Sequence, residues 1–126
     1  MYKLSDKSLE RLKGVHPDLV KVVKKAIEYT PIDFRITEGL RTKERQAYLL
    51  KKGATKTMRS RHLVGKAIDF VALPDGVVSW DFALYKQIAT AFQKAAAELN
   101  VPIVWGGSWE SFKDGPHIEL NRKHYP

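Results

Sequence analysis

The chain has 126 residues, which is close to the commonest size of a single domain and long enough to bury one hydrophobic core. Its 44% hydrophobic and 29% charged residues exclude a disordered chain, and it has no apolar run near the roughly 18 residues of a membrane span. Cysteine is absent, which excludes a disulfide scaffold, thiolate catalysis and cysteine-ligated zinc, so any metal must bind His, Asp or Glu.

Positive charge is concentrated in the first half of the chain, whose overall net charge is +8. Residues 1–66 include 17 basic and 7 acidic residues, whereas residues 67–126 include 5 and 7. A basic face favours a polyanionic partner such as nucleic acid, an anionic membrane or an anionic wall polymer. A charge run alone is more often a solvated surface, so the charge does not choose among these partners.

The N-terminus has neither an apolar core nor a small-residue cleavage site, which predicts that there is no signal peptide. We find no internal repeat, low-complexity segment or linker. We therefore expect residues 1–126 to form one domain without a separate wall-binding domain.

The sequence of the first half of the chain predicts three helices and one strand. Ser5 precedes a first helix that ends near Gly14, and His16 is better read as a helix cap than as a metal ligand. The predicted elements that follow are a helix from Pro17 to Pro31, a strand at 34–38, and a helix from Thr42 to Gly53 that includes Ala47, Leu49 and Leu50.

The sequence of the second half predicts a loop, three strands and one long helix. Residues 54–61 form a polar loop, and the predicted strands are 67–71, 101–105 and 117–120. Apolar residues recur at helical spacing over about 81–99, and Ser79 is the expected cap of that helix. This order predicts a small α+β domain with a mainly antiparallel sheet packed with helices.

His62 and Asp69 are the first candidate metal ligands. On one continuous helix their spacing of seven residues would separate them by about 10 Å, which is too far to share an ion. Gly65 permits a turn between them, so His62 is expected at a loop edge and Asp69 on the following strand. A carboxylate among apolar neighbours is costly to bury unless it is paired or bound to metal. The alternative is an exposed Asp on the solvent face of an edge strand.

The C-terminal segment supplies a third candidate ligand, His117, on the last predicted strand. Glu119 lies on the same face and is either a partner for the free imidazole nitrogen of a ligand histidine or a solvated residue. Asp114 precedes His117 across a Gly-Pro turn, where a carboxylate can accept the proton of an attacking water. The alternatives are an ordinary turn aspartate and a hydrogen-bonded strand histidine.

Arg41 and Trp105 are candidates for contact with a substrate. An arginine at a strand-to-helix turn can direct its guanidinium at a carboxylate or a developing oxyanion, or it can form a surface ion pair with Glu38 or Glu44. Trp105 and Trp109 either line a substrate groove or pack in the core.

Three motifs in order resemble one family. They are Glu38-Gly-Leu-Arg41-Thr42, then Ser60-x-His62-x-x-Gly65-x-Ala67-x-Asp69, then Asp114-x-x-His117-x-Glu119. Together they resemble the zinc D-Ala-D-Ala peptidase-like (LAS) metallopeptidases, and within them the small L-alanyl-D-glutamate endopeptidases of bacteriophages, the endolysins. The resemblance covers nearly the whole chain.

The resemblance implies one zinc ion at the sheet, held by His62, Asp69 and His117. It implies that Asp114 is the general base and that Arg41 polarises the scissile carbonyl, and that Ser60 contacts substrate or shapes its loop. The implied substrate is the L-Ala–D-Glu bond of the peptidoglycan stem peptide. The implied protein is a monomer with no nucleic-acid partner and no membrane insertion, which stays in the host cytoplasm until a holin releases it.

Two other functions stay open from the sequence. One is a D-Ala-D-Ala carboxypeptidase or dipeptidase of the same family. The other is a non-catalytic basic module that binds wall polymer or nucleic acid, although few aromatics interleave with the basic run and no nucleic-acid motif is present.

Overall fold

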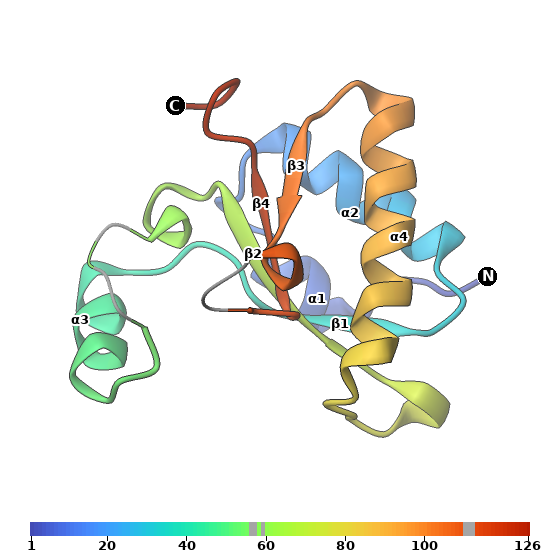
Figure 1. The fold of residues 1–126 in the computed structure, drawn as a ribbon, viewed down its shortest axis with the longest axis horizontal. Coiled ribbons are helices and arrows are strands. Elements are labelled where there is room, and N and C mark those ends of the chain that lie inside the picture. Colours follow the sequence, from blue (N-terminus) through green and yellow to red (C-terminus); the bar gives the residue numbers. More distant parts are fainter. Residues whose placement is uncertain (56–57, 59, 110–112) are drawn as a thin grey trace.

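A sheet of four antiparallel strands forms the centre of the computed structural model, which describes residues 1–55, 58, 60–109 and 113–126 (Figure 1). The strand order is β1-β2-β4-β3. The strands are β1 (Phe34–Glu38), β2 (Ala67–Ala72), β3 (Ile103–Trp105) and β4 (His117–Leu120). Each pairing is antiparallel, so the predicted α+β class and the predicted sheet are confirmed.

The register of the central strands brings together residues that are far apart in sequence. β2 lies between β1 and β4, and Asp69 is opposite His117 on one side and Glu38 on the other. The pairing of β1 with β2 shifts between Ile36 and Glu38, so Glu38 is displaced by one position toward Asp69. The middle of the sheet therefore gathers the polar side chains of three strands.

Helices α2 (Pro17–Tyr29) and α4 (Phe82–Leu99) pack against each other and supply most of the helical core, while α1 (Asp6–Arg11) contacts β1. The core includes a cluster of aromatic rings. The centroid of the Phe92 ring lies 5.1 Å from that of Phe34 and 5.4 Å from that of Phe70. The predicted cap at His16 is confirmed, because its Nδ1 accepts the backbone N–H of Asp18.

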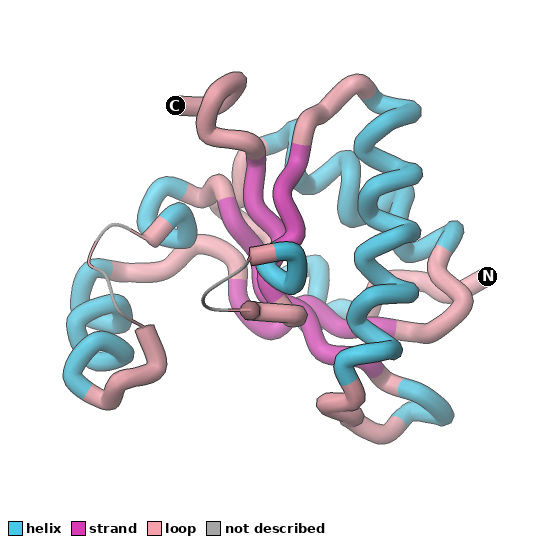
Figure 2. Tube along the Cα trace, viewed as in Figure 1, coloured by secondary structure: helices cyan, strands magenta, loops and turns pink. Residues whose placement is uncertain are grey.

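Helix α3 (Lys43–Lys51) lies at the opposite side of the molecule from α4 (Figures 1 and 2). Thr42 caps it as predicted, but Ala47, Leu49 and Leu50 do not form a buried face, and Gln46 is the one fully buried residue of this helix. Gln46 is buried because it accepts a hydrogen bond from Arg41. This helix is therefore tied to the rest of the protein through a polar contact.

The predicted cap of the long helix is wrong by two residues. The N-cap is Asp81, whose carboxylate accepts the backbone N–H of Ala83, while Ser79 is held by the backbone of Ala72 and accepts the N–H of Asp81. The 3₁₀ helix η1 (Arg61–Val64), which the sequence did not predict, begins at the last residue of the predicted loop 54–61, and residues 56, 57 and 59 lie outside the described residues. Over the described parts of the chain, no helix is long and apolar enough to cross a membrane.

Candidate metal centre and catalytic site

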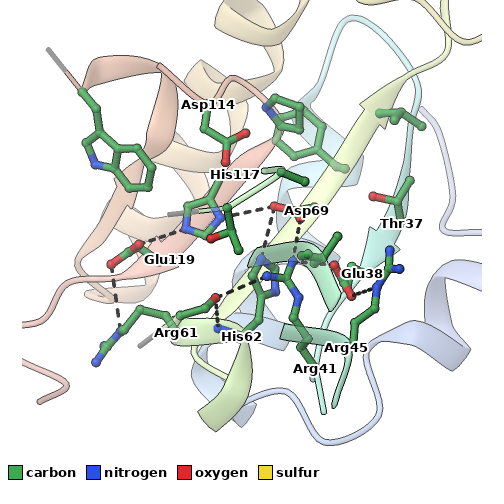
Figure 3. A pocket seen from close by; sticks show the side chains of 18 of the residues that line it. Thr37, Glu38, Arg41, Arg45, Arg61, His62, Asp69, Asp114, His117 and Glu119 are labelled. Carbon is green, nitrogen blue, oxygen red and sulfur yellow. Dashed lines mark hydrogen bonds and ion pairs between the residues drawn. The ribbon is translucent and has the colours of Figure 1, made fainter. Parts of the chain in front are cut away.

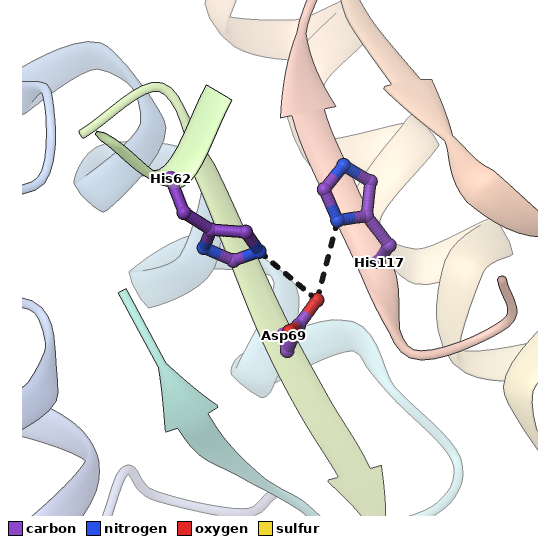
Figure 4. Close-up of side chains that lie close together, drawn as sticks. All are labelled: His62, Asp69 and His117. Atoms are coloured by element: carbon purple, nitrogen blue, oxygen red, sulfur yellow. Dashed lines mark hydrogen bonds and ion pairs between the residues drawn. The ribbon is translucent and has the colours of Figure 1, made fainter. Parts of the chain in front are cut away.

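His62, Asp69 and His117 come from three elements and meet at the middle of the sheet (Figure 4). His62 is in η1, Asp69 in β2 and His117 in β4. Gly65 makes the turn between the first two, with φ of 69°, and a Cβ there would lie 2.4 Å from the backbone oxygen of Gly14. The turn therefore requires glycine both for its dihedral angle and for the close approach of the N-terminal segment.

The three side chains present one ligand atom each to a shared space. His62 Nε2 lies 3.3 Å from Asp69 Oδ1, and His117 Nδ1 lies 3.2 Å from the same oxygen. The ligand atoms all lie within 4.8 Å of one another. Both histidines are buried and Asp69 is half-buried, so the cluster is shielded from bulk water on most sides.

The outer contacts of the two rings decide which nitrogen faces inward. His62 Nδ1 lies 2.9 Å from the backbone oxygen of Gly39, and since a carbonyl only accepts, Nδ1 carries the hydrogen. His117 Nε2 lies 2.9 Å from Glu119 Oε1, so the neutral ring is protonated at Nε2. The inward nitrogens of the neutral rings are then bare lone pairs facing a carboxylate.

Three converging acceptors require a cation or a proton between them. His62 Nε2 is buried and has no hydrogen-bond partner among the described residues. Two imidazole nitrogens and one carboxylate oxygen are the donor set that a divalent metal such as zinc accepts in a site with an open position. The residues therefore fit a metal ion.

Without metal, a proton takes the place of the cation. Burial alone would lower the pKa of His117, but hydrogen bonds with Asp69 and Glu119 outweigh burial and raise it to about 9. Burial alone would raise the pKa of Asp69, but the two facing imidazoles outweigh burial and hold it well below its usual range. Asp69 is thus ionised at neutral pH and ready to bind a cation.

Glu119 is buried behind His117 and is held by two arginines. Arg122 Nε lies 3.3 Å and Arg61 Nε 3.9 Å from Glu119 Oε2. Burial opposes ionisation, but the hydrogen bond to His117, aided by Arg122, lowers the pKa of Glu119. An ionised Glu119 fixes the orientation of the His117 ring and strengthens its basicity as a ligand.

Asp114 lies at the wall of the same cavity, on the loop before β4 (Figure 3). Its backbone N–H donates to Gly106 O at 3.0 Å, and its own carbonyl accepts the N–H of His117. Burial and the nearby charge of Asp69 raise the pKa of Asp114. A half-buried carboxylate with a raised pKa next to a metal site has the properties of a general base.

Arg41 is buried in the cavity wall by contacts from four residues. Its guanidinium donates to Glu38, to Gln46 Oε1 at 2.8 Å, and at 3.5 Å to both Ser60 Oγ and Asp69 Oδ2. Its backbone N–H also donates to His62 O at 2.9 Å. The ion pair with Glu38 that the sequence left open as an alternative is therefore present, but it is largely buried and lies beside the candidate metal ligand Asp69.

The cavity that contains these residues has a volume of about 590 Å³. Ser60 and Trp109 line it, and the Trp109 ring lies 5.1 Å from the His117 ring. Trp105 does not line it, because its indole is buried in the core against Phe82 and donates to Gly115 O. Trp105 therefore packs in the core, which is the second of the two alternatives that the sequence left open.

Several cavity residues were not singled out from the sequence. They are Thr37, Arg45, Arg61, Trp80 and Arg122. The arginines belong to a generally basic chain, so no local pattern separates them from other surface cations. Trp80 could have been noticed in the sequence. It is a large aromatic residue between the polar residues Ser79 and Asp81, and it does not belong to the apolar face of a predicted helix.

Comparison with known proteins shows the family of this chain. The family model described as phage L-alanyl-D-glutamate peptidase matches residues 1–124. The chain belongs to this family. The L-alanyl-D-glutamate peptidase of Escherichia phage T5 is 32% identical over 128 residues, a match that covers 98% of this chain and 93% of that protein.

Solved structures of other proteins share the fold of this chain. The crystal structure of the Serratia marcescens L-Ala D-Glu endopeptidase ChiX superposes with a TM-score of 0.94 at 47% identity, covering 98% of this chain and 93% of that one. The vancomycin resistance D,D-dipeptidase VanXYg superposes with a TM-score of 0.53 at 18% identity, covering 84% of this chain and 50% of that one. The second match supports the fold alone.

Proposed function

We propose that this family member is a peptidoglycan endopeptidase that hydrolyses the L-Ala–D-Glu bond of the stem peptide with one zinc ion. His62, Asp69 and His117 hold the ion, Asp114 is the general base and Arg41 stabilises the oxyanion. The observation that carries the proposal is the convergence of three acceptor atoms, from two buried histidines and the half-buried Asp69, beside a carboxylate with a raised pKa in one cavity. The relatives named for this bond select the substrate.

Each residue has a separable task. When bound, zinc supplies a Lewis acid that polarises the scissile carbonyl and makes water easier to deprotonate. Asp114 accepts the proton of the attacking water and passes it to the leaving nitrogen of D-Glu, which becomes the new N-terminus. Arg41 is fixed by Glu38 and Gln46, so its charge faces the developing oxyanion without reorganisation. Glu119 keeps the His117 ring in its ligating orientation.

The bond cleaved is tested by digesting purified muropeptides and identifying the products by mass spectrometry. We expect a new N-terminal D-Glu, with no released sugar fragment and no free D-alanine. Release of D-Ala or D-Ala-D-Ala as the main product would instead assign the carboxypeptidase or dipeptidase activity. An Asp114→Ala protein at matched zinc loading is the control for contaminating hydrolases.

The ligand set is tested by removing and restoring the metal. Zinc content, measured by atomic emission, should be about one per chain, should fall with EDTA treatment, and should return with added zinc. His62→Ala and His117→Ala should lose zinc and activity together. Full zinc occupancy in both variants would exclude this ligand set.

We also propose a setting in the cell for this activity. The family is named for phage proteins, and its substrate is the cell wall. The protein acts as a monomeric, single-domain endolysin that reaches the wall from the host cytoplasm through a holin pore. Its basic first half favours attraction to anionic envelope polymers.

A further inference from the structure

Trp80 is the exposed large hydrophobic residue among the described residues that line the catalytic cavity. It lines the cavity together with Asp69 and Asp114, yet 68% of its surface is accessible to solvent. None of the roles proposed above for the metal, the base or the oxyanion uses it. An exposed indole in the lining of a cavity offers a large apolar face that a ligand can cover.

The indole is held in a fixed orientation. Its ring lies parallel to that of Tyr85, with 6° between the planes and 6.2 Å between the centroids. Tyr85 is buried, and its hydroxyl donates to Ser79 O and accepts from the N–H of Ala72. Ser79 in turn pairs with Ala72 through its backbone. One face of Trp80 is thus supported by the core, and a flat surface is preorganised before any ligand arrives.

Trp80 has exposed hydrophobic neighbours in the chain. Val77, Val78 and Phe82 are also exposed hydrophobic residues, and they lie within two or three residues of Trp80. The lining of the cavity also includes Glu38 and Arg45, which form an ion pair with 3.5 Å between Arg45 Nε and Glu38 Oε2. Trp109 differs from Trp80 because its ring packs against His117. Trp80 is therefore an exposed aromatic ring in the lining of a largely polar cavity, within a segment that includes other exposed hydrophobic residues.

We propose that Trp80 is a stacking platform for the muramic acid sugar of the substrate. The inference rests on the proposed cleavage of the L-Ala–D-Glu bond. The axial C–H bonds of a pyranose ring form an apolar face that packs on an indole, while its hydroxyl and acetamido groups remain in water. Trp80 suits such a ring, because one face of its indole stacks on Tyr85 while the rest of the side chain is exposed to solvent.

The chemistry of the substrate places a sugar within reach of Trp80. L-Ala is the first residue of the stem peptide, and a lactyl group joins its nitrogen to muramic acid. Only L-Ala and this lactyl group separate the scissile carbonyl from the sugar ring, a span of about 7 Å when extended. One cavity of about 590 Å³ has both the proposed metal ligands and Trp80 in its lining, and a sugar tethered this closely to the scissile bond stays at that cavity. Trp80 thus makes the enzyme favour stem peptides that are still attached to glycan.

The test compares two substrates that differ only in the sugar. One is N-acetylmuramyl-L-Ala-γ-D-Glu-diaminopimelate, and the other is the same tripeptide with an N-acetyl group on L-Ala. We expect the wild-type protein to cleave the first with a kcat/KM about tenfold higher than the second. Trp80→Ala and Trp80→Leu should remove this preference by slowing only the sugar-bearing substrate, whereas Trp80→Phe should keep most of it. Tyr2→Ala, an exposed aromatic outside the cavity wall, is the matched control and should leave the preference intact.

Each other outcome overturns the inference in a distinguishable way. If wild type cleaves both substrates equally well, the sugar is not bound and the proposed function stands. An equal loss on both substrates in Trp80→Ala and Trp80→Leu would show that Trp80 only supports the fold. Loss of the preference in Trp109→Ala but not in the Trp80 variants would move the platform to the other indole. If zinc-loaded wild type cleaves neither substrate, the proposed function fails, and the sugar site with it.

Discussion

Gly106→Ala should reduce turnover by displacing Asp114 without removing any reacting group. Gly106 lies against the backbone before β4, and its carbonyl accepts the N–H of Asp114. A Cβ at this position would lie 2.4 Å from Asp114 O, 3.1 Å from Asp114 Cβ and 3.0 Å from His117 Cβ. The crowded atom is a backbone oxygen, so rotation of a side chain cannot relieve the contact.

The size of the displacement follows from these distances. Real Cβ atoms essentially never lie closer than 3.0 Å to another heavy atom, so the 2.4 Å separation must grow by about 0.6 Å or more. A misplacement of about 1 Å in a catalytic group can cost on the order of 10²-fold. We therefore expect kcat to fall by about 10- to 100-fold if Asp114 is the base.

The matched control is Gly115→Ala, next to Asp114 in the chain. A Cβ there would meet Tyr85 at 3.4 Å and Phe82 at 3.5 Å, which are ordinary contacts. Both variants would be assayed for kcat on muropeptides, for zinc content and for melting temperature. Unchanged kcat in a folded, zinc-loaded Gly106→Ala protein would refute the argument, and an equal loss in Gly115→Ala would show that the whole loop is merely sensitive to substitution.

The remaining predictions concern the site itself. Asp114→Ala should keep its zinc and lose about 10²- to 10⁴-fold in kcat, and loss of zinc in that variant would make Asp114 a ligand instead. Glu119→Gln keeps the shape of the side chain but not its charge, so zinc affinity in a competition titration should fall by about 10- to 100-fold; unchanged affinity would exclude its role behind His117. Arg41→Ala should lower kcat more than it raises KM, and a change in KM alone would show that Arg41 only binds substrate. Because the pKa of His117 is raised to about 9 in the metal-free protein, zinc must displace its proton at pH 7, and calorimetry in buffers of different ionisation enthalpy should detect about one proton released. Apparent zinc affinity should therefore weaken as pH falls below 9, and affinity independent of pH between 6 and 9 would refute this assignment.

Interactions within a few residues of one another were predictable from the sequence. The caps at Ser5, His16 and Thr42, the turn at Gly65 and the strand at 117–120 all agree with the structure. The cap at Ser79 was wrong because the backbone of this residue pairs with Ala72, a contact outside its own helix. Local patterns fail where a distant segment competes for the same groups.

The motifs were also sufficient to indicate the family, since three short patterns in order are specific even though each is weak alone. They named His62, Asp69 and His117 as a ligand set, but not the atoms that face one another. The inward nitrogens are Nε2 of one ring and Nδ1 of the other, because Gly39 and Glu119 occupy the outer nitrogens. Gly39 is 23 residues from His62, so no local pattern contains that information.

Only the tertiary structure decided which aromatic and basic residues surround the site. Trp105 and Trp80 are both tryptophans near turns, yet one is buried in the core and the other is exposed on the cavity wall. Arg61 and Arg122 meet at Glu119 because the turn before β2 and the end of β4 lie together across the sheet. Composition and spacing determine which elements form and which side chains are chemically able to react. The pairing register of strands distant in sequence determines which of those side chains meet, because a shift of one residue would turn each of them to the other face.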